Sequence, residues 1–176
     1  MKKLKKTMFM FAGLIVIAAG FVFGKLYVVE ASIKSGQKFG DWVVSCAKDN
    51  KQQEICLLTQ QYSVTKDDKT QVIAVLQLGY FGTDKVLKLF EIVPLGVNLE
   101  SGTSIISVDK LIAPAKFFVC DAGGCQAKAD LSADDIKALT SNSPNSLAMI
   151  GGDGKQINIP ISNNGLKEGL EALSKK

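Results

Sequence analysis

The four cysteines of this 176-residue chain fall in two close pairs, Cys46 with Cys56 and Cys120 with Cys125. In an exported domain such pairs form disulfides, whereas in the cytosol they favour a metal site or a redox centre. The compartment therefore decides whether the cysteines stabilise the fold as disulfides or form a metal or redox site. The N-terminus is interpreted first, because it indicates the compartment.

The N-terminal segment is typical of an export signal. Residues 1–6 contain four lysines and no acid, and residues 7–24 are almost wholly apolar. A basic stretch followed by an apolar run marks a secretory signal, but this run is also long enough to cross a membrane as a helix. We predict that residues 1–31 are either a signal peptide cleaved after Ala31 or an uncleaved inner-membrane anchor with its lysines in the cytoplasm.

The net charge of +4 comes from that segment. No Asp or Glu precedes Glu30, and from Lys25 onward 17 lysines balance 17 acids. The exported part is therefore close to neutral, and we expect no nucleic-acid partner.

The composition also excludes most catalytic machinery. The chain contains no His and no Arg, so it has neither a Ser-His-Asp nor a Cys-His arrangement, no imidazole metal ligand and no guanidinium for bidentate anion contacts. A Ser-x-x-Lys spacing occurs four times, which is near chance in a lysine-rich chain. The four pairs are Ser35–Lys38, Ser45–Lys48, Ser63–Lys66 and Ser107–Lys110.

Metal and carboxylate sites are disfavoured for reasons of spacing. Nine residues separate Cys46 from Cys56, whereas paired zinc ligands are usually separated by about two to four. Asp134 and Asp135 are neighbours and do not face each other on a helix, so we interpret them as first-turn acids favoured by the helix dipole. We predict a protein without metal or cofactor that is not an enzyme. A Ser-Lys or thiol enzyme is the less favoured alternative.

Strand patterns dominate the rest of the chain. Residues 32–38 are interpreted as a tether or an extended entry segment, and a single domain is predicted over 39–176. Nine short apolar or alternating runs with turn residues between them favour an antiparallel β-sandwich or barrel. The runs cover 42–46, 55–64, 72–80, 86–93, 104–108, 116–120, 125–131, 147–150 and 156–161.

Two short helices are expected near the C-terminus. Ser132 and Asp135 are spaced as in a capping box and lead into Ile136 and Leu139. Further on, a stripe of three leucines at i, i+4 and i+7 predicts a second helix that docks on the core. These are Leu166, Leu170 and Leu173.

Within such a fold, each cysteine pair flanks a loop between two strands. Local pairing of Cys46 with Cys56 and of Cys120 with Cys125 is the preferred choice among the three possible connectivities, because cross-strand cysteines at a hairpin approach closely. Each disulfide would close a small loop and contribute about 2–3 kcal/mol.

Several ordered motifs resemble the invasion-associated locus B (IalB) family of small envelope proteins of Gram-negative bacteria. They span nearly the whole predicted domain. The pieces are 39–46 (FGDWVVSC), 56–60 (CLLTQ), 94–102 (PLGVNLESG), 108–109 (VD), 120–127 (CDAGGCQA) and 159–165 (IPISNNG). The positions that carry the motifs are Trp42, Gln60, Pro94, Gly96, Asp109, Gly124 and Ala127. The chain departs from the family at 163–166, where members tend to show Ser-Leu-x-Gly-Phe.

The resemblance implies an immunoglobulin-like β-sandwich, export to the periplasm or cell envelope, and an association with adhesion to or invasion of host cells, notably erythrocytes. It implies no enzymatic activity. We therefore expect a disulfide-stapled envelope protein that acts by contact with protein partners, either on a host-cell surface or in the envelope. The alternative is a general periplasmic module with a stress-protective or chaperone-like role and no host contact.

Overall fold

The computed structural model describes residues 32–108 and 110–176, and Ser32–Lys176 form one compact unit. This described part contains ten strands and two helices. The strands are β1 (Lys38–Phe39), β2 (Trp42–Lys48), β3 (Glu54–Lys66), β4 (Lys69–Phe81), β5 (Val86–Val93), β6 (Thr103–Ser107), β7 (Lys110–Asp121), β8 (Gly124–Asp130), β9 (Asn145–Ile150) and β10 (Gln156–Ile161). The helices are α1 (Ala133–Leu139) and α2 (Leu166–Ser174).

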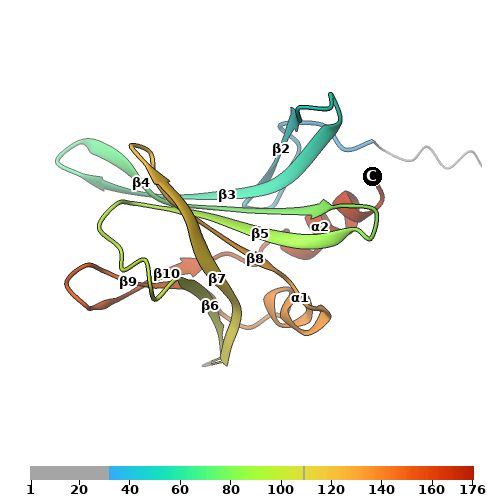
Figure 1. The fold of residues 1–176 in the computed structure, drawn as a ribbon. Coiled ribbons are helices and arrows are strands. Elements are labelled where there is room, and N and C mark those ends of the chain that lie inside the picture. The colour runs from blue at the N-terminus through green and yellow to red at the C-terminus, as the bar shows by residue number, and fades with distance from the viewer. Residues whose placement is uncertain (1–31, 109) are drawn as a thin grey trace, which may run out of the picture. The chain divides into compact units, whose positions relative to one another are not determined.

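All strand pairs are antiparallel and follow the order β1-β2-β3-β4-β5-β8-β7-β6-β9-β10. The long strand β7 belongs to two layers, because its first half pairs with β6 and its second half with β8. We call β1–β5 with β8 the first layer, and β6, β9 and β10 the second layer. Figure 1 shows β7 running from β8 towards β6, with β9 and β10 near β6.

The core lies between the two layers. Leu58, Leu78 and Leu89 of the first layer and Ile105 and Leu147 of the second are fully buried and belong to one cluster. Each such side chain contributes about 1.5–3 kcal/mol by leaving water. The predicted fold class is confirmed: the chain is mainly β and antiparallel, with two short helices. The layers are joined through β7 into one continuous strand order.

Both predicted helices are present. Helix α1 begins with a complete capping box, in which Ser132 accepts a hydrogen bond from the Asp135 backbone and Asp135 accepts one from the Ser132 backbone. In α2 the leucine stripe is buried against the core, as the periodicity predicts. Gly169 of α2 lies directly against the Leu58 side chain, which places the helix on the inner face of the first layer.

The segment before β1 packs against the domain. Ile33 belongs to the core cluster, and the backbone of Val44 exchanges hydrogen bonds with Gly36 and Gln37. Among the described residues, no helix has the length and apolarity needed to span a membrane. The predicted signal or anchor, residues 1–31, lies outside the described residues, so its cleavage and its role stay predictions.

Candidate functional site

Both cysteine pairs form the predicted cross-strand disulfides. Cys46 is bonded to Cys56 across β2 and β3, and Cys120 to Cys125 across β7 and β8. The Cα atoms of each pair are 4.0 Å apart. Such a short distance is typical of directly opposite residues that do not exchange backbone hydrogen bonds. The predicted local connectivity is therefore confirmed.

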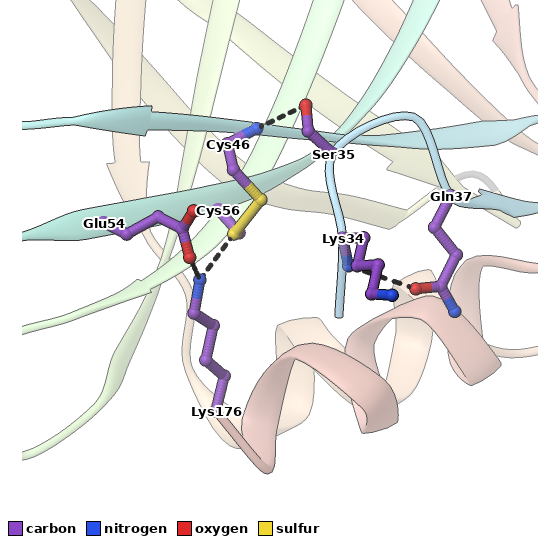
Figure 2. Close-up of a disulfide and its surroundings, with 7 residues drawn as sticks. All are labelled: Lys34, Ser35, Gln37, Cys46, Glu54, Cys56 and Lys176. Atoms are coloured by element: carbon purple, nitrogen blue, oxygen red, sulfur yellow. Dashed lines mark hydrogen bonds and ion pairs between the residues drawn. A yellow bond between two sulfur atoms is a disulfide. The ribbon is translucent and has the colours of Figure 1, made fainter. Parts of the chain in front are cut away.

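The first disulfide lies beside a charged pair at the end of α2. Lys176 Nζ is 2.8 Å from Cys56 Sγ and also donates to the Glu54 carboxylate (Figure 2). This ammonium group lowers the pKa of Glu54 by hydrogen bonding and by charge. On the other side, the Cys46 backbone N–H donates to Ser35 Oγ at 3.2 Å.

An open pocket of about 220 Å³ borders the same disulfide. Its wall includes Cys56, Tyr80, Leu173 and the two cations Lys85 and Lys176. Lys85 donates to the Ser174 carbonyl oxygen at the C-terminal end of α2, where a cation is favoured by the helix dipole. The lysines therefore already have partners on the protein.

The side chains of Cys46, Cys56 and Glu54 are of metal-ligand type and lie within 4.8 Å of one another. The two sulfur atoms are bonded to each other, however, and a thiolate rather than a disulfide is the metal ligand and nucleophile. In its oxidised form this cluster offers one carboxylate, which is already paired with Lys176. The Cys46–Cys56 disulfide and the Glu54–Lys176 ion pair therefore fit a structural role rather than a metal site.

The family-motif residues Trp42 and Gln60 join the C-terminal segment to the first layer. Trp42 Nε1 donates to the Ser162 carbonyl oxygen at 2.9 Å, and the Ser162 N–H donates to Gln60 Oε1 at 3.2 Å. Tyr62 donates to the same Gln60 oxygen, and Ser162 Oγ donates to Asp41 at 2.5 Å. Burial raises the pKa of Tyr62 to about 12, so its hydroxyl stays protonated and able to donate.

A carboxyl group lies in the centre of the core. Glu91 of β5 is fully buried, and one of its oxygens accepts a hydrogen bond from Thr103 of β6. The other oxygen has no hydrogen-bond partner. Burial raises the pKa of Glu91 to about 7, and the Thr103 hydrogen bond only partly offsets this effect.

Three further motif positions have close-packing roles. Gly124 has φ of 132°, and a Cβ there would lie 2.4 Å from the Val93 carbonyl oxygen. Ala127 is fully buried opposite Glu91 in the β5–β8 pair. Gly96 accepts a hydrogen bond from Gly152, which ties the loop after β5 to the β9–β10 hairpin.

The two remaining motif positions are Pro94 and Asp109. Pro94 directly follows β5 and is half-buried. Asp109 lies outside the described residues.

The Ser-x-x-Lys pairs do not assemble in the described part of the chain. Among its hydrogen bonds, none joins a lysine Nζ to the hydroxyl of Ser35, Ser45, Ser63 or Ser107. Asp135 is used by the capping box, as expected for a first-turn acid.

Pattern reasoning missed Glu91 and the Ser162 network for different reasons. Glu91 had a local signal, because it occupies an inward position between Leu89 and Val93 in an otherwise apolar run. Ser162 had none, since its partners Trp42 and Gln60 are separated from it by more than 100 residues in the sequence.

Comparisons with known proteins show the family of the chain and a similar fold. The sequence profile of the family described as "Invasion associated locus B (IalB) protein" matches residues 42–174 of the chain. Among solved structures, the crystal structure of invasion associated protein B from Bartonella henselae is similar, with a TM-score of 0.67 and 18% sequence identity. The match covers 79% of this chain and 94% of that one. No curated protein sequence matches. At this identity the structural likeness establishes a common fold.

Proposed function

The chain belongs to the invasion associated locus B family, and from this premise we propose that it is an exported, non-enzymatic envelope protein that acts by contact with other proteins. Its setting is the periplasm or outer envelope of a Gram-negative bacterium. The family is described as invasion associated, and we infer from this description that the contact is with the surface of a host cell.

One observation carries the proposal: the family match covers a domain closed by two cross-strand disulfides. Disulfides persist in oxidising compartments and are rare in the cytosol, so they suit a domain that works outside the inner membrane. The motif residues Trp42, Gln60, Gly124 and Ala127 are used in packing and hydrogen bonding within the fold. This use is consistent with a scaffold that presents a surface.

The location is tested in intact cells that produce the chain. Protease is added to whole cells and to lysed cells, and the remaining chain is followed by immunoblotting beside a soluble periplasmic marker. Host contact predicts digestion in whole cells while the marker is protected. Protection of both proteins would instead favour a periplasmic module with a stress-protective or chaperone-like role.

Host contact is then tested directly. Purified residues 32–176 are mixed with erythrocyte membranes and sedimented, with the same domain after reduction and alkylation of both disulfides as the control. We expect saturable binding that the reduced control loses. Equal sedimentation with and without membranes would contradict the host-contact proposal.

Absence of enzymatic activity is tested with serine- and cysteine-directed covalent probes on the folded domain. We expect no labelling, because all four cysteines are in disulfides and no serine–lysine pair is formed among the described residues. Stoichiometric labelling of one serine would contradict the proposal.

A further inference from the structure

The two disulfides have different surroundings. Cys56 is buried, but its sulfur contacts the Lys176 ammonium group at 2.8 Å and it lies in the wall of the open pocket of about 220 Å³. Cys125 is buried opposite Val93 of β5 and belongs to the core cluster. Among the described residues, no lysine donates a hydrogen bond to the sulfur of Cys120 or Cys125. A cation therefore contacts the first disulfide and not the second.

Further charged groups lie around the first disulfide. Lys48 and Glu54 form a strand pair two residues from the cysteines, so they share a face of β2 and β3 with them. Lys176 donates both to Glu54 and to the Cys56 sulfur (Figure 2). An ammonium group has three N–H donors, so it can hold a carboxylate and a thiolate at once. With Lys85 in the pocket wall, this setting is electropositive and partly exposed, as is typical of reactive cysteines.

Access and charge distinguish the two sulfur atoms of this disulfide. Exchange begins when a thiolate attacks one sulfur, and the other sulfur leaves as a thiolate. Lys176 Nζ lies against Cys56 Sγ, so the cation shields this sulfur from attack and would stabilise its thiolate. Cys46 is half-buried and is therefore the more accessible residue. The contacts favour attack at Cys46 and departure of Cys56.

We propose that the Cys46–Cys56 disulfide is a site of reversible S-thiolation by a low-molecular-weight thiol, with Cys46 as the attacked residue and Cys56 as the leaving group. The thiol first loses its proton to water. Its sulfur then forms a bond to Cys46 Sγ, the bond between the two cysteines breaks, and the electron pair of that bond goes to Cys56 Sγ, beside Lys176.

The step is balanced without a further reactant. The sulfur of the incoming thiol is oxidised and Cys56 is reduced. Attack of the Cys56 thiolate on Cys46 restores the disulfide and releases the thiol. A small thiol is the expected reactant, because exchange depends on access and a half-buried sulfur is reached more readily by a small molecule than by the cysteine of a folded protein.

The second disulfide is unfavourable for exchange in both directions. Attack at the exposed Cys120 would expel Cys125 as a thiolate within the core, where burial disfavours a charge. The neighbouring Asp121 carboxylate would also repel an incoming thiolate. Attack at Cys125 is blocked by its burial. Cys120–Cys125 is therefore an internal control for Cys46–Cys56.

The domain should stay folded after the exchange. Strands β2 and β3 are paired over Val43–Lys48 and Glu54–Thr59, so the disulfide joins strands that already exchange backbone hydrogen bonds. The chain is modified in this reaction and does not act as a catalyst. The proposal is thus independent of host contact.

Glutathione is the probe, and residues 32–176 are used because they form one compact unit. The domain is incubated with excess glutathione without oxygen, quenched with acid, alkylated with N-ethylmaleimide and mapped by mass spectrometry. Cleavage after Lys48 and Lys51 separates the Cys46 and Cys56 peptides.

We expect glutathione on Cys46 and the maleimide on Cys56, with this disulfide opening at least about tenfold faster than Cys120–Cys125. Glutathione on Cys56, or faster opening of Cys120–Cys125, would overturn the proposal. Opening by reduced thioredoxin but not by glutathione would overturn the assignment to a small thiol.

Two variants separate the effect of charge from a loosening of the strands. Lys176→Gln and Glu54→Gln break the same ion pair, but they have opposite effects on a Cys56 thiolate. Because a stabilised thiolate leaves faster, Lys176→Gln should slow the opening about threefold or more and Glu54→Gln should speed it about twofold. If the ion pair only held the strands together, both variants would speed it.

Lys155→Gln is the matched control, since it also removes the lysine of an exposed ion pair, with Asp153 in the β9–β10 hairpin. It should leave the rate unchanged, and circular dichroism checks that all three variants are folded. A rate that changes in the same direction in Lys176→Gln and Glu54→Gln, or in neither, overturns the proposal.

Discussion

At the scale of single residues, Glu91 is the most unusual feature of the core. A carboxylate without a counter-ion is unstable in an apolar environment, and its pKa rises until the neutral form prevails. Thr103 supplies one hydrogen bond from the second layer, and the remaining oxygen is unpaired. The contact joins β5 of the first layer to β6 of the second.

Replacement of Glu91 by Gln should therefore remove a pH dependence of stability. The pKa of Glu91 is about 7 in the folded chain and 4.5 in the reference state, so the folded state binds the proton more tightly. The wild-type stability is fully present below pH 4.5 and falls as the pH rises towards and through 7, by on the order of 3 kcal/mol. In Glu91→Gln this decrease should be absent.

Urea unfolding at pH 5, 6, 7 and 8 measures the effect. Glu100→Gln is the control, because Glu100 is exposed and its replacement should leave the wild-type slope unchanged. Equal slopes for wild type and Glu91→Gln would show that the Glu91 carboxyl is not protonated in the folded chain.

At the scale of secondary-structure elements, the start of α2 depends on a backbone contact that only glycine permits. Gly165 is the N-cap of α2 and has φ of 81°. A Cβ at this position would lie 2.1 Å from the Phe39 carbonyl oxygen, which is a backbone atom that cannot move aside independently. The contact fixes the C-terminal helix against the turn between β1 and β2.

Gly165→Ala should consequently lower the free energy of unfolding by about 3 kcal/mol or more, because steric overlap adds to the roughly 1–2 kcal/mol of left-handed backbone strain. Gly154 provides a matched control, since its φ is 79° and a Cβ there meets no atom within 4 Å. Gly154→Ala should lose only about 1 kcal/mol. Denaturant unfolding of both variants gives the comparison, and equal losses would mean that the Phe39 contact is unimportant.

Strand β7 is the element that pattern reasoning placed least well. A short strand over 116–120 is predicted, whereas β7 runs over Lys110–Asp121. The first half of β7 contains Pro114, and proline is usually excluded from strands. Strand propensity therefore does not predict this half. Pro114 is tolerated here beside Ala113, which has φ of 48°, and near the register shift of the β6–β7 pair.

At the scale of the whole molecule, β7 has a thermodynamic consequence. Since it is paired in both layers and since both layers share one core cluster, neither layer has a separate core of its own. We expect residues 32–176 to unfold in a single cooperative transition.

Trp42 makes this expectation easy to measure. It is the only tryptophan in the chain and is fully buried in the first layer, so its fluorescence reports on tertiary packing. The urea transition followed by fluorescence should coincide with the one followed by far-ultraviolet circular dichroism. Separate midpoints would indicate that the layers unfold independently.

The local features of this protein follow from its sequence alone. Alternating apolar residues specify strands, the Ser132–Asp135 spacing specifies the start of α1, and short loops between strands bring each cysteine next to its partner. Each of these depends on residues near one another in the chain, where the geometry is set by local backbone periodicity.

Tertiary structure alone decided the features that depend on distant contacts. The Ser162 network, the pairing of Glu91 with Thr103 and the sharing of β7 between layers arise from strand order, which local periodicity does not encode. The apolar runs of β4 and β5 are visible in the sequence, but only the strand order shows that one face of each is buried in the core and the other is left open. The physical reason is that periodicity specifies which side chains share a face, whereas burial depends on what packs against that face.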